Sequence, residues 1–239
     1  MVGGWETRYN ALMGEESERS TNEADPKRTT SIPDLEFWTQ TVPNQAQKVL
    51  AGSGGRKTRP ITWENRMKPF HDALIRRLVT ENVDPQKQLR VVVVGIGNKG
   101  APTCFDLLRD FKEKGFSQVS VLGMDNNTQC VEEAEAGRAN ADSSNALAFV
   151  AADLFDLNTL ETVGANGADV VVSSNVLMYY EEPGQKQKAL DALRGVVREG
   201  GLLALADGPT LPGSPTAYDI YRKEGANLIL QETGELSGA

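Results

Sequence analysis

The residues of this sequence that are best placed for chemistry begin with a glycine-rich turn. Gly95, Gly97 and Gly100 form a G-x-G-x-x-G pattern directly after the apolar run Val91–Val94. Glycines at this spacing allow a tight turn and a close approach of the backbone to a ligand, and a following helix supplies free N–H donors. The turn could need glycine for its conformation alone, but three glycines after four valines favour nucleotide binding.

Two acidic residues follow later apolar runs in the same way. Asp125 comes directly after Val119–Met124 and lies 25 positions beyond Gly100, close to the interval of about 20 found in dinucleotide sites. An acid at this point can accept hydrogen bonds from both ribose hydroxyls of an adenosine. Asp153 follows Ala148–Ala152 and could meet an adenine amino group. Each acid could instead cap the next helix, although the glycine turn favours the ligand role for Asp125.

The glycine turn and the two acids suit two kinds of cofactor, because nicotinamide dinucleotides and S-adenosylmethionine both present a ribose to an acid. A dehydrogenase commonly adds a His, Tyr or Lys proton donor. Neither a Tyr-x-x-x-Lys pattern nor a histidine near a predicted strand end occurs in the sequence. A methyltransferase needs mainly to align a sulfonium methyl with a nucleophile. A nicotinamide-dependent oxidoreductase and a non-catalytic binding protein remain alternatives to a methyltransferase.

Few side chains could move a proton or orient a methyl acceptor. His71 is the one histidine of the chain and has the one side chain whose ordinary pKa is near 7. It lies in a predicted helix that runs from Trp63 to about Thr80, where a lone histidine is more often a surface or boundary residue. Tyr179 and Tyr180 follow a fourth apolar run, where a phenol could orient an acceptor or pack against the next helix. These three residues are the catalytic candidates.

Composition narrows the classes of function further. The 25 Lys and Arg against 33 Asp and Glu give a net charge of −8, which disfavours a nucleic-acid partner. Cys104 and Cys130 are the only cysteines and lack metal-ligand spacing, so no metal is expected, and we expect both to be small buried apolar residues. No apolar run approaches the roughly 20 residues of a membrane span and no secretory signal is visible, which predicts a cytoplasmic protein.

Apolar runs alternate with amphipathic stretches from Leu89 onward, the pattern of parallel strands joined by crossover helices. The predicted strands cover 91–94, 119–124, 148–152, 170–172 and 202–206, with helices at 102–114, 128–139, around 158–163 and at 189–197. Gly200 and Gly201 are expected to end the last helix, and Tyr218–Lys223 and Ala226–Gln231 to form a final antiparallel pair. The predicted fold class is a doubly wound, mostly parallel α/β sheet with helices on both faces.

A helical and loop-rich extension precedes this sheet. We expect residues 1–58 to form a partly flexible cap, because they combine a polar tract with a few aromatic side chains. Residues 59–239 are expected to form the cofactor-binding domain. Trp5, Tyr9 and Trp38 could close over cofactor and substrate as a lid, although aromatic residues in an extension usually serve as anchors.

The region from Leu89 to Gly208 resembles the class I S-adenosylmethionine-dependent methyltransferases. Asn175–Tyr180, with the sequence NVLMYY, is similar to the end of the fourth strand in the chemotaxis-receptor methyltransferase branch. Asp125–Gly137 is similar to the end of the second strand and the following helix of that branch. The resemblance implies a Rossmann-like fold, S-adenosylmethionine as cofactor with S-adenosylhomocysteine as product, and direct in-line transfer. We expect the methyl acceptor to be a small molecule, and a protein side chain is the less favoured alternative.

The resemblance also assigns roles to single residues. It implies cofactor contacts at Gly95, Gly97 and Gly100 around the methionine moiety, Asp125 and Asn126 at the ribose, Asp153 and Leu154 at the adenine, and Ser174 and Asn175 near the methyl-bearing face. The glycine turn is one residue longer than the usual G-x-G-x-G of the family. Ser174 stands where the chemotaxis branch has Arg beside the Asn, which argues against methylation of receptor glutamates.

Overall fold

The computed structural model describes residues 67–97, 100–139, 146–156, 160–161, 165–177, 180, 183–207 and 216–236. Its elements are α4 (Lys68–Thr80), β1 (Leu89–Val94), α5 (Pro102–Glu113), β2 (Val119–Asp125), α6 (Thr128–Ala139), β3 (Leu147–Ala151), β4 (Ala168–Ser174), α8 (Pro183–Val196), β5 (Val197–Asp207), β6 (Thr216–Glu224) and β7 (Asn227–Leu236). The strands form one sheet in the order β3-β2-β1-β4-β5-β6-β7. Pairing is parallel from β3 through β5 and antiparallel at β5–β6 and β6–β7. The doubly wound α/β prediction is confirmed.

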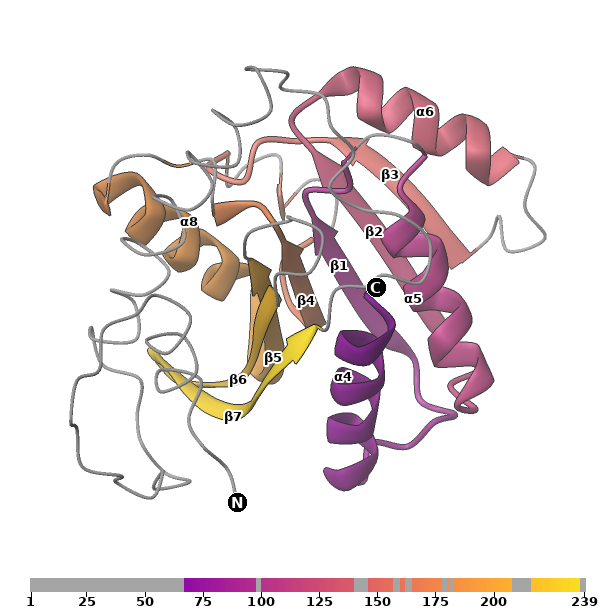
Figure 1. Ribbon diagram of the computed structural model, residues 1–239, viewed down its shortest axis with the longest axis vertical. Coiled ribbons are helices and arrows are strands. Elements are labelled where there is room, and N and C mark those ends of the chain that lie inside the picture. The colour runs from indigo at the N-terminus through magenta and orange to yellow at the C-terminus, as the bar shows by residue number, and fades with distance from the viewer. Residues whose placement is uncertain are drawn as a thin grey trace, which may run out of the picture.

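Helices cover both faces of the sheet (Figure 1). The valines of β1 alternate between the two layers: Val91 and Val93 belong to the core under α4, α5 and α6, whereas Val92 and Val94 belong to the core under α8. A strand buried on both faces has no polar side, which explains its unbroken run of β-branched residues. No helix within the described ranges is long and apolar enough to cross a membrane.

The boundary between the last helix and the fifth strand differs from the prediction. Gly200 and Gly201 do not end the last helix: α8 ends at Val196, and Val197 already pairs with Ala168 of β4 as the first residue of β5. The pairing register shifts between Ala168 and Val170, which pairs with Leu202. The two glycines therefore lie inside a bulged strand, and the positive φ of 69° at Gly200 serves that irregularity.

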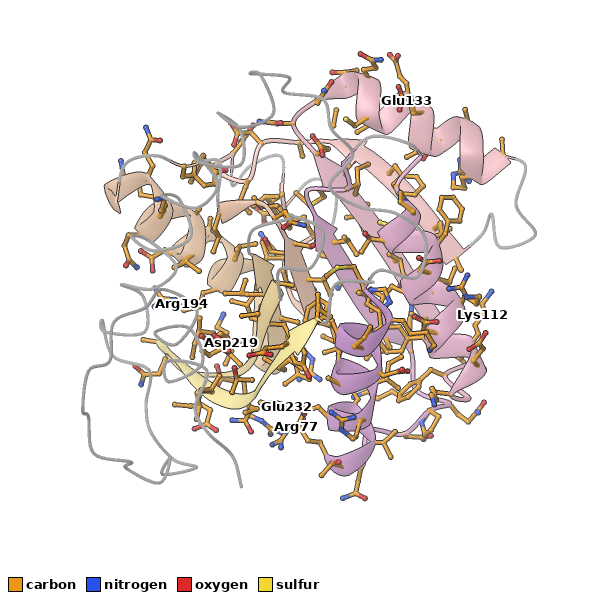
Figure 2. The ribbon with its side chains drawn as sticks, in the orientation of Figure 1. Arg77, Lys112, Glu133, Arg194, Asp219 and Glu232 are labelled. Atoms are coloured by element: carbon orange, nitrogen blue, oxygen red, sulfur yellow. The ribbon has the colours of Figure 1, made fainter. Side chains whose placement is uncertain are left out.

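The predicted antiparallel pair near the C-terminal end is confirmed as β6 and β7, which are joined by Gly225 and Ala226. Helix α4 is tied to this hairpin by polar side chains. Arg76 contacts Glu232, and Arg77 donates a hydrogen bond to Gln231; Figure 2 shows Arg77 and Glu232 at this junction. The first helix of the described region thus contacts the last strand of the sheet.

Candidate functional site

Strand order reverses between β1 and β4. From β1 the chain continues to β2 and β3 on one side of the sheet, whereas β4 continues to β5 on the other. In doubly wound sheets, ligands bind in the crevice outside the carboxyl ends of the two strands at such a point. The carboxyl end of β1 carries the glycine turn, and the carboxyl end of β4 carries Ser174 and Asn175. The topology therefore brings together the glycine turn and the end of β4, which the sequence indicated as separate parts of a site.

The glycine turn depends on glycine for conformation and for space. Gly95, Gly97 and Gly100 have φ values of 76°, 69° and 73°, in the region that side-chain-bearing residues rarely adopt. A Cβ on Gly95 would lie 2.2 Å from Cγ2 of Val176, so the turn packs directly on the segment after β4. A Cβ on Gly97 would meet nothing within 4 Å. The backbone at Gly97 consequently has an open side at which a ligand could approach closely.

Asp125 connects this turn to the end of β2. Its Oδ2 accepts a hydrogen bond from the backbone N–H of Gly97 at 3.1 Å, and its Oδ1 accepts one from the N–H of Asn127 at 2.9 Å. A carboxylate offers about four lone-pair sites, so two acceptor sites remain for a ribose diol. Asp125 is half-buried and Asn126 beside it is exposed. The chain's own groups fit an adenosine ribose at this position.

The end of β4 holds a strained asparagine. Asn175 has a φ of 57° and is only 5% exposed. Its backbone N–H donates to the carbonyl of Ala206 at 2.9 Å, and its Nδ2 donates to Oγ of Ser174 at 3.2 Å. Its Oδ1 is buried without a hydrogen-bond partner within the described part of the chain. A buried polar atom left without a partner is uncommon in native structures.

Asp153 and Leu154 lie after β3 in a turn that also presents an aromatic side chain. Asp153 is exposed and its Oδ1 accepts the N–H of Phe155 at 2.9 Å, while Leu154 is buried. Phe155 makes an edge contact with Tyr180 at a centroid distance of 5.4 Å. Burial, followed by the negative charge of Asp153, raises the pKa of the Tyr180 phenol. Phe155 was not singled out from the sequence, although it is an aromatic residue two positions after Asp153.

His71 is not a surface or boundary residue, contrary to the sequence-based expectation. Its side chain is fully buried, and Nδ1 lies 2.8 Å from Oδ2 of Asp110 on α5. One turn earlier, at the N-cap of α4, the Sδ of Met67 lies 3.9 Å from Oγ of Ser174. His71 is therefore paired with a residue of α5 rather than with the glycine turn or the end of β4. Because its partner lies 39 residues away in sequence, local sequence patterns could not reveal the pair.

Several other candidates fall outside the described residues: Trp5, Tyr9, Trp38 and Tyr179, together with the whole predicted cap at 1–58. Cys104 and Cys130 are buried free cysteines, as expected, and burial raises the pKa of both thiols. Among the described side chains, no group of three or more His, Cys, Asp or Glu is placed to hold a metal ion.

A protein-family model described as a methyltransferase domain matches residues 99–205. The match runs from the end of the glycine turn into β5 and so includes both acids and the end of β4. The match supports the prediction of a methyltransferase domain for this part of the chain. No similar sequence is found among curated proteins.

Three solved structures with a similar chain path are distant in sequence. A candidate sarcosine dimethylglycine methyltransferase from Galdieria sulphuraria is 13% identical, with a TM-score of 0.44, over 69% of this chain and 59% of that one. Magnesium protoporphyrin IX methyltransferase from Synechocystis with bound S-adenosylhomocysteine is 15% identical, with a TM-score of 0.42, over 72% and 69%. N-methyltransferase NodS from Bradyrhizobium japonicum is 17% identical, with a TM-score of 0.41, over 69% and 72%. The chain thus spans about three fifths of the first of these proteins.

Proposed function

We propose that this protein is an S-adenosylmethionine-dependent methyltransferase that acts on a small molecule by direct in-line transfer. The observation that carries this proposal is the bond from the Gly97 N–H to Asp125 Oδ2, which sets the open backbone of the turn beside a carboxylate with free lone pairs. The match of residues 99–205 to a methyltransferase domain supports the same function. The net charge of −8 disfavours nucleic acid as the acceptor.

The chain's own residues bind and orient in this proposal. Gly95, Gly97 and Gly100 surround the methionine moiety, Asp125 and Asn126 hold the ribose, Asp153 and Leu154 frame the adenine, and Ser174 and Asn175 lie at the methyl-bearing face. When bound, S-adenosylmethionine supplies an activated methyl group on a sulfonium sulfur. Alignment of that methyl with the acceptor supplies much of the acceleration, so a strong general base is not required. Tyr179, Tyr180 and His71 are proposed as the catalytic candidates, with the two phenols orienting the acceptor.

The N-terminal 58 residues are proposed to form the cap that selects the acceptor, with Trp5, Tyr9 and Trp38 as its ligand-facing aromatic residues. The similarity of Asn175–Tyr180 to the chemotaxis-receptor branch supports a common origin of this segment. Serine at position 174 in place of that branch's arginine argues for a different acceptor. A cytoplasmic location is proposed from the two scattered cysteines.

Calorimetric titration of the full chain with S-adenosylhomocysteine and, separately, with NADH tests the proposed function. We expect micromolar binding of S-adenosylhomocysteine and none of NADH. Absence of S-adenosylhomocysteine binding would overturn the methyltransferase proposal, and binding of NADH alone would support an oxidoreductase. Replacement of Trp38 by alanine is expected to leave S-adenosylhomocysteine affinity unchanged and to lower methyl transfer to the acceptor.

A further inference from the structure

Asn175 connects β4 to both of its neighbouring strands. Its backbone N–H donates to the carbonyl of Ala206 on β5, at 2.9 Å, one position beyond the last residue of β4. The next residue, Val176, already contacts the turn that follows β1, because a Cβ on Gly95 would lie 2.2 Å from its Cγ2. β1 and β5 lie on opposite sides of β4 (Figure 1). The chain therefore crosses from one neighbouring strand to the other within a single residue.

The left-handed conformation of Asn175, with a φ of 57°, makes this change of direction possible. Asparagine is one of the few residues besides glycine that adopt this region of φ and ψ. The side chain itself is enclosed: Nδ2 donates to Oγ of Ser174 at 3.2 Å, and Oδ1 is buried. These contacts give Asn175 a conformational role rather than a ligand-binding one.

The same dipeptide occurs in the same conformation at a second place in the chain. Asn82 has a φ of 56° and is followed by Val83, just as Asn175 is followed by Val176. Asn82 is exposed beyond the C-cap of α4, and the half-buried Val83 packs on the apolar core under α4. A left-handed asparagine that turns the chain, followed by a valine that packs, is thus a structural unit that this chain also uses away from the crevice.

The glycine turn is held differently on its two sides. Toward β2 it is held by hydrogen bonds: the N–H of Gly95 donates to the carbonyl of Met124 at 2.8 Å, and the N–H of Gly97 donates to Oδ2 of Asp125 at 3.1 Å. Toward β4 the turn packs on a methyl group of Val176. Because that methyl group fills the space beside the side-chain-free Gly95, it limits how close the turn lies to β4.

We propose that Asn175 is a positioning residue that acts through Val176. Its left-handed turn seats Val176 against Gly95 and so holds the glycine turn in the form that binds the methionine moiety of the cofactor. This inference rests on the proposed function, which places the glycine turn around that moiety. Asn175 then influences cofactor affinity without contacting the cofactor.

Asn175→Ala and Asn175→Gly separate conformation from contact, because both remove the amide but only the glycine variant adopts a positive φ without strain. We expect Asn175→Ala to bind S-adenosylhomocysteine about tenfold more weakly than Asn175→Gly in calorimetry, since the strained variant populates the binding conformation only in part. A direct contact between the amide and the ligand predicts equal affinities for the two variants, and that result would overturn the inference.

Asn82→Ala and Asn82→Gly are the matched controls for backbone strain. Their stabilities in urea unfolding should differ in the same direction as those of the Asn175 variants, because Asn82 has nearly the same φ. Their affinities for S-adenosylhomocysteine should be equal, because Asn82 lies after α4 and away from the glycine turn. A difference in affinity between the two Asn82 variants would show that strain alone changes binding and would contradict a special role for Asn175.

Val176→Ala tests the second half of the proposal and does not depend on whether Asn175→Ala folds. It should weaken S-adenosylhomocysteine binding by about fivefold, since the methyl group that contacts Gly95 is removed. Val83→Ala removes the half-buried valine of the other Asn-Val pair and should change the affinity by less than about twofold. Equal affinities for the two valine variants would overturn the role of Val176.

5′-Methylthioadenosine, which lacks the amino-acid part of S-adenosylhomocysteine, shows whether the effect is confined to the glycine turn. Asn175→Ala and Val176→Ala should weaken its binding by less than about twofold, because the part that the turn surrounds is missing. An equal loss for both ligands would place the effect elsewhere in the site and would contradict the inference. Failure of the wild-type protein to bind S-adenosylhomocysteine would instead overturn the proposed function.

Discussion

The backbone N–H of Gly97 donates a hydrogen bond to Oδ2 of Asp125 at 3.1 Å. This bond joins the turn after β1 to the acid after β2, so the two parts of the candidate site hold each other in place. Asp125 therefore has two roles. Its Oδ2 accepts a hydrogen bond from the glycine turn, and its remaining lone pairs can accept hydrogen bonds from a ligand. Replacing Asp125 should therefore both loosen the glycine turn and remove a hydrogen-bond acceptor for the ligand.

Asp125→Ala is expected to weaken S-adenosylhomocysteine binding by about tenfold or more, since it removes a charged acceptor for the ribose and frees the Gly97 N–H. Calorimetry measures the change. Asp84→Ala is the matched control, because Asp84 Oδ1 accepts the N–H of Gln86 two residues on, as Asp125 Oδ1 does with Asn127, but in the turn before β1. Equal affinities for the two variants would contradict the assignment of Asp125 to the cofactor.

Gly95→Ala is expected to abolish S-adenosylhomocysteine binding, because its Cβ would lie 2.2 Å from Cγ2 of Val176 and push the turn away from the end of β4. Gly115→Ala separates this effect from backbone strain. Gly115 has a φ of 87°, and a Cβ there would meet nothing within 4 Å. Gly115→Ala should lose about 1 kcal/mol of stability in denaturant unfolding through backbone strain alone. Gly95→Ala should lose more, because of the added contact with Val176, and only Gly95→Ala should lose the ligand. A Gly95→Ala protein that binds normally would show that the contact with Val176 is unimportant.

The buried pair of His71 and Asp110 predicts that the protein loses stability at acidic pH. Burial by itself raises the pKa of Asp110, but the hydrogen bond and charge of His71, with Lys68 and Arg109, hold it below its ordinary value of 3.8. A carboxyl with a lowered folded pKa stabilises the protein above its unfolded pKa, and this contribution is lost as pH falls through the folded pKa. The stabilising contribution of Asp110 should therefore be fully present above about pH 5 and decline below about pH 4.

Asp110→Asn is expected to cost about 3 kcal/mol at pH 7, because it leaves the buried His71 without its charged partner, and less at pH 3. Urea unfolding at the two pH values measures the difference. Asp72→Asn, which removes the exposed pair with Lys68, should cost less than about 1 kcal/mol. A cost for Asp110→Asn that does not change between pH 7 and pH 3 would show that its ionised form contributes nothing.

Tyr180 should stay protonated above pH 10, since burial and then the charge of Asp153 raise the pKa of its phenol. The ultraviolet difference between wild type and Tyr180→Phe, recorded from pH 9 to 12, isolates its ionisation. Asp153→Asn should move that ionisation to lower pH by removing the nearby negative charge. An unchanged titration in Asp153→Asn would place the two side chains too far apart to share a ligand.

Much of the fold could be predicted from local sequence patterns. Buried parallel strands such as β1 and β4 contain unbroken apolar residues, and the glycines and acids that follow them mark where each strand ends. The helix boundaries of α5 and α6 were predicted to within one residue for the same reason. Gly200 and Gly201 gave the wrong boundary because glycine suits a helix end and a strand bulge equally, and only the pairing with β4 distinguishes them.

The site was less accessible, because its defining features are not local. The burial of His71 depends on Asp110, and the strain at Asn175 depends on its bonds to Ser174 and Ala206. The types and spacing of these residues were enough to make them candidates for a ligand crevice. They could not show that one amide oxygen would be buried there without a partner.

The run of β5, β6 and β7 in chain order also has a kinetic meaning. Their antiparallel pairings join residues close in sequence, whereas the pairing of β1 with β4 must close a loop of more than seventy residues. Local pairings cost less loop-closure entropy and form sooner. We therefore expect the β5–β6–β7 meander to form early in folding, and the pairing of β1 with β4, which completes the crevice between them, to form late.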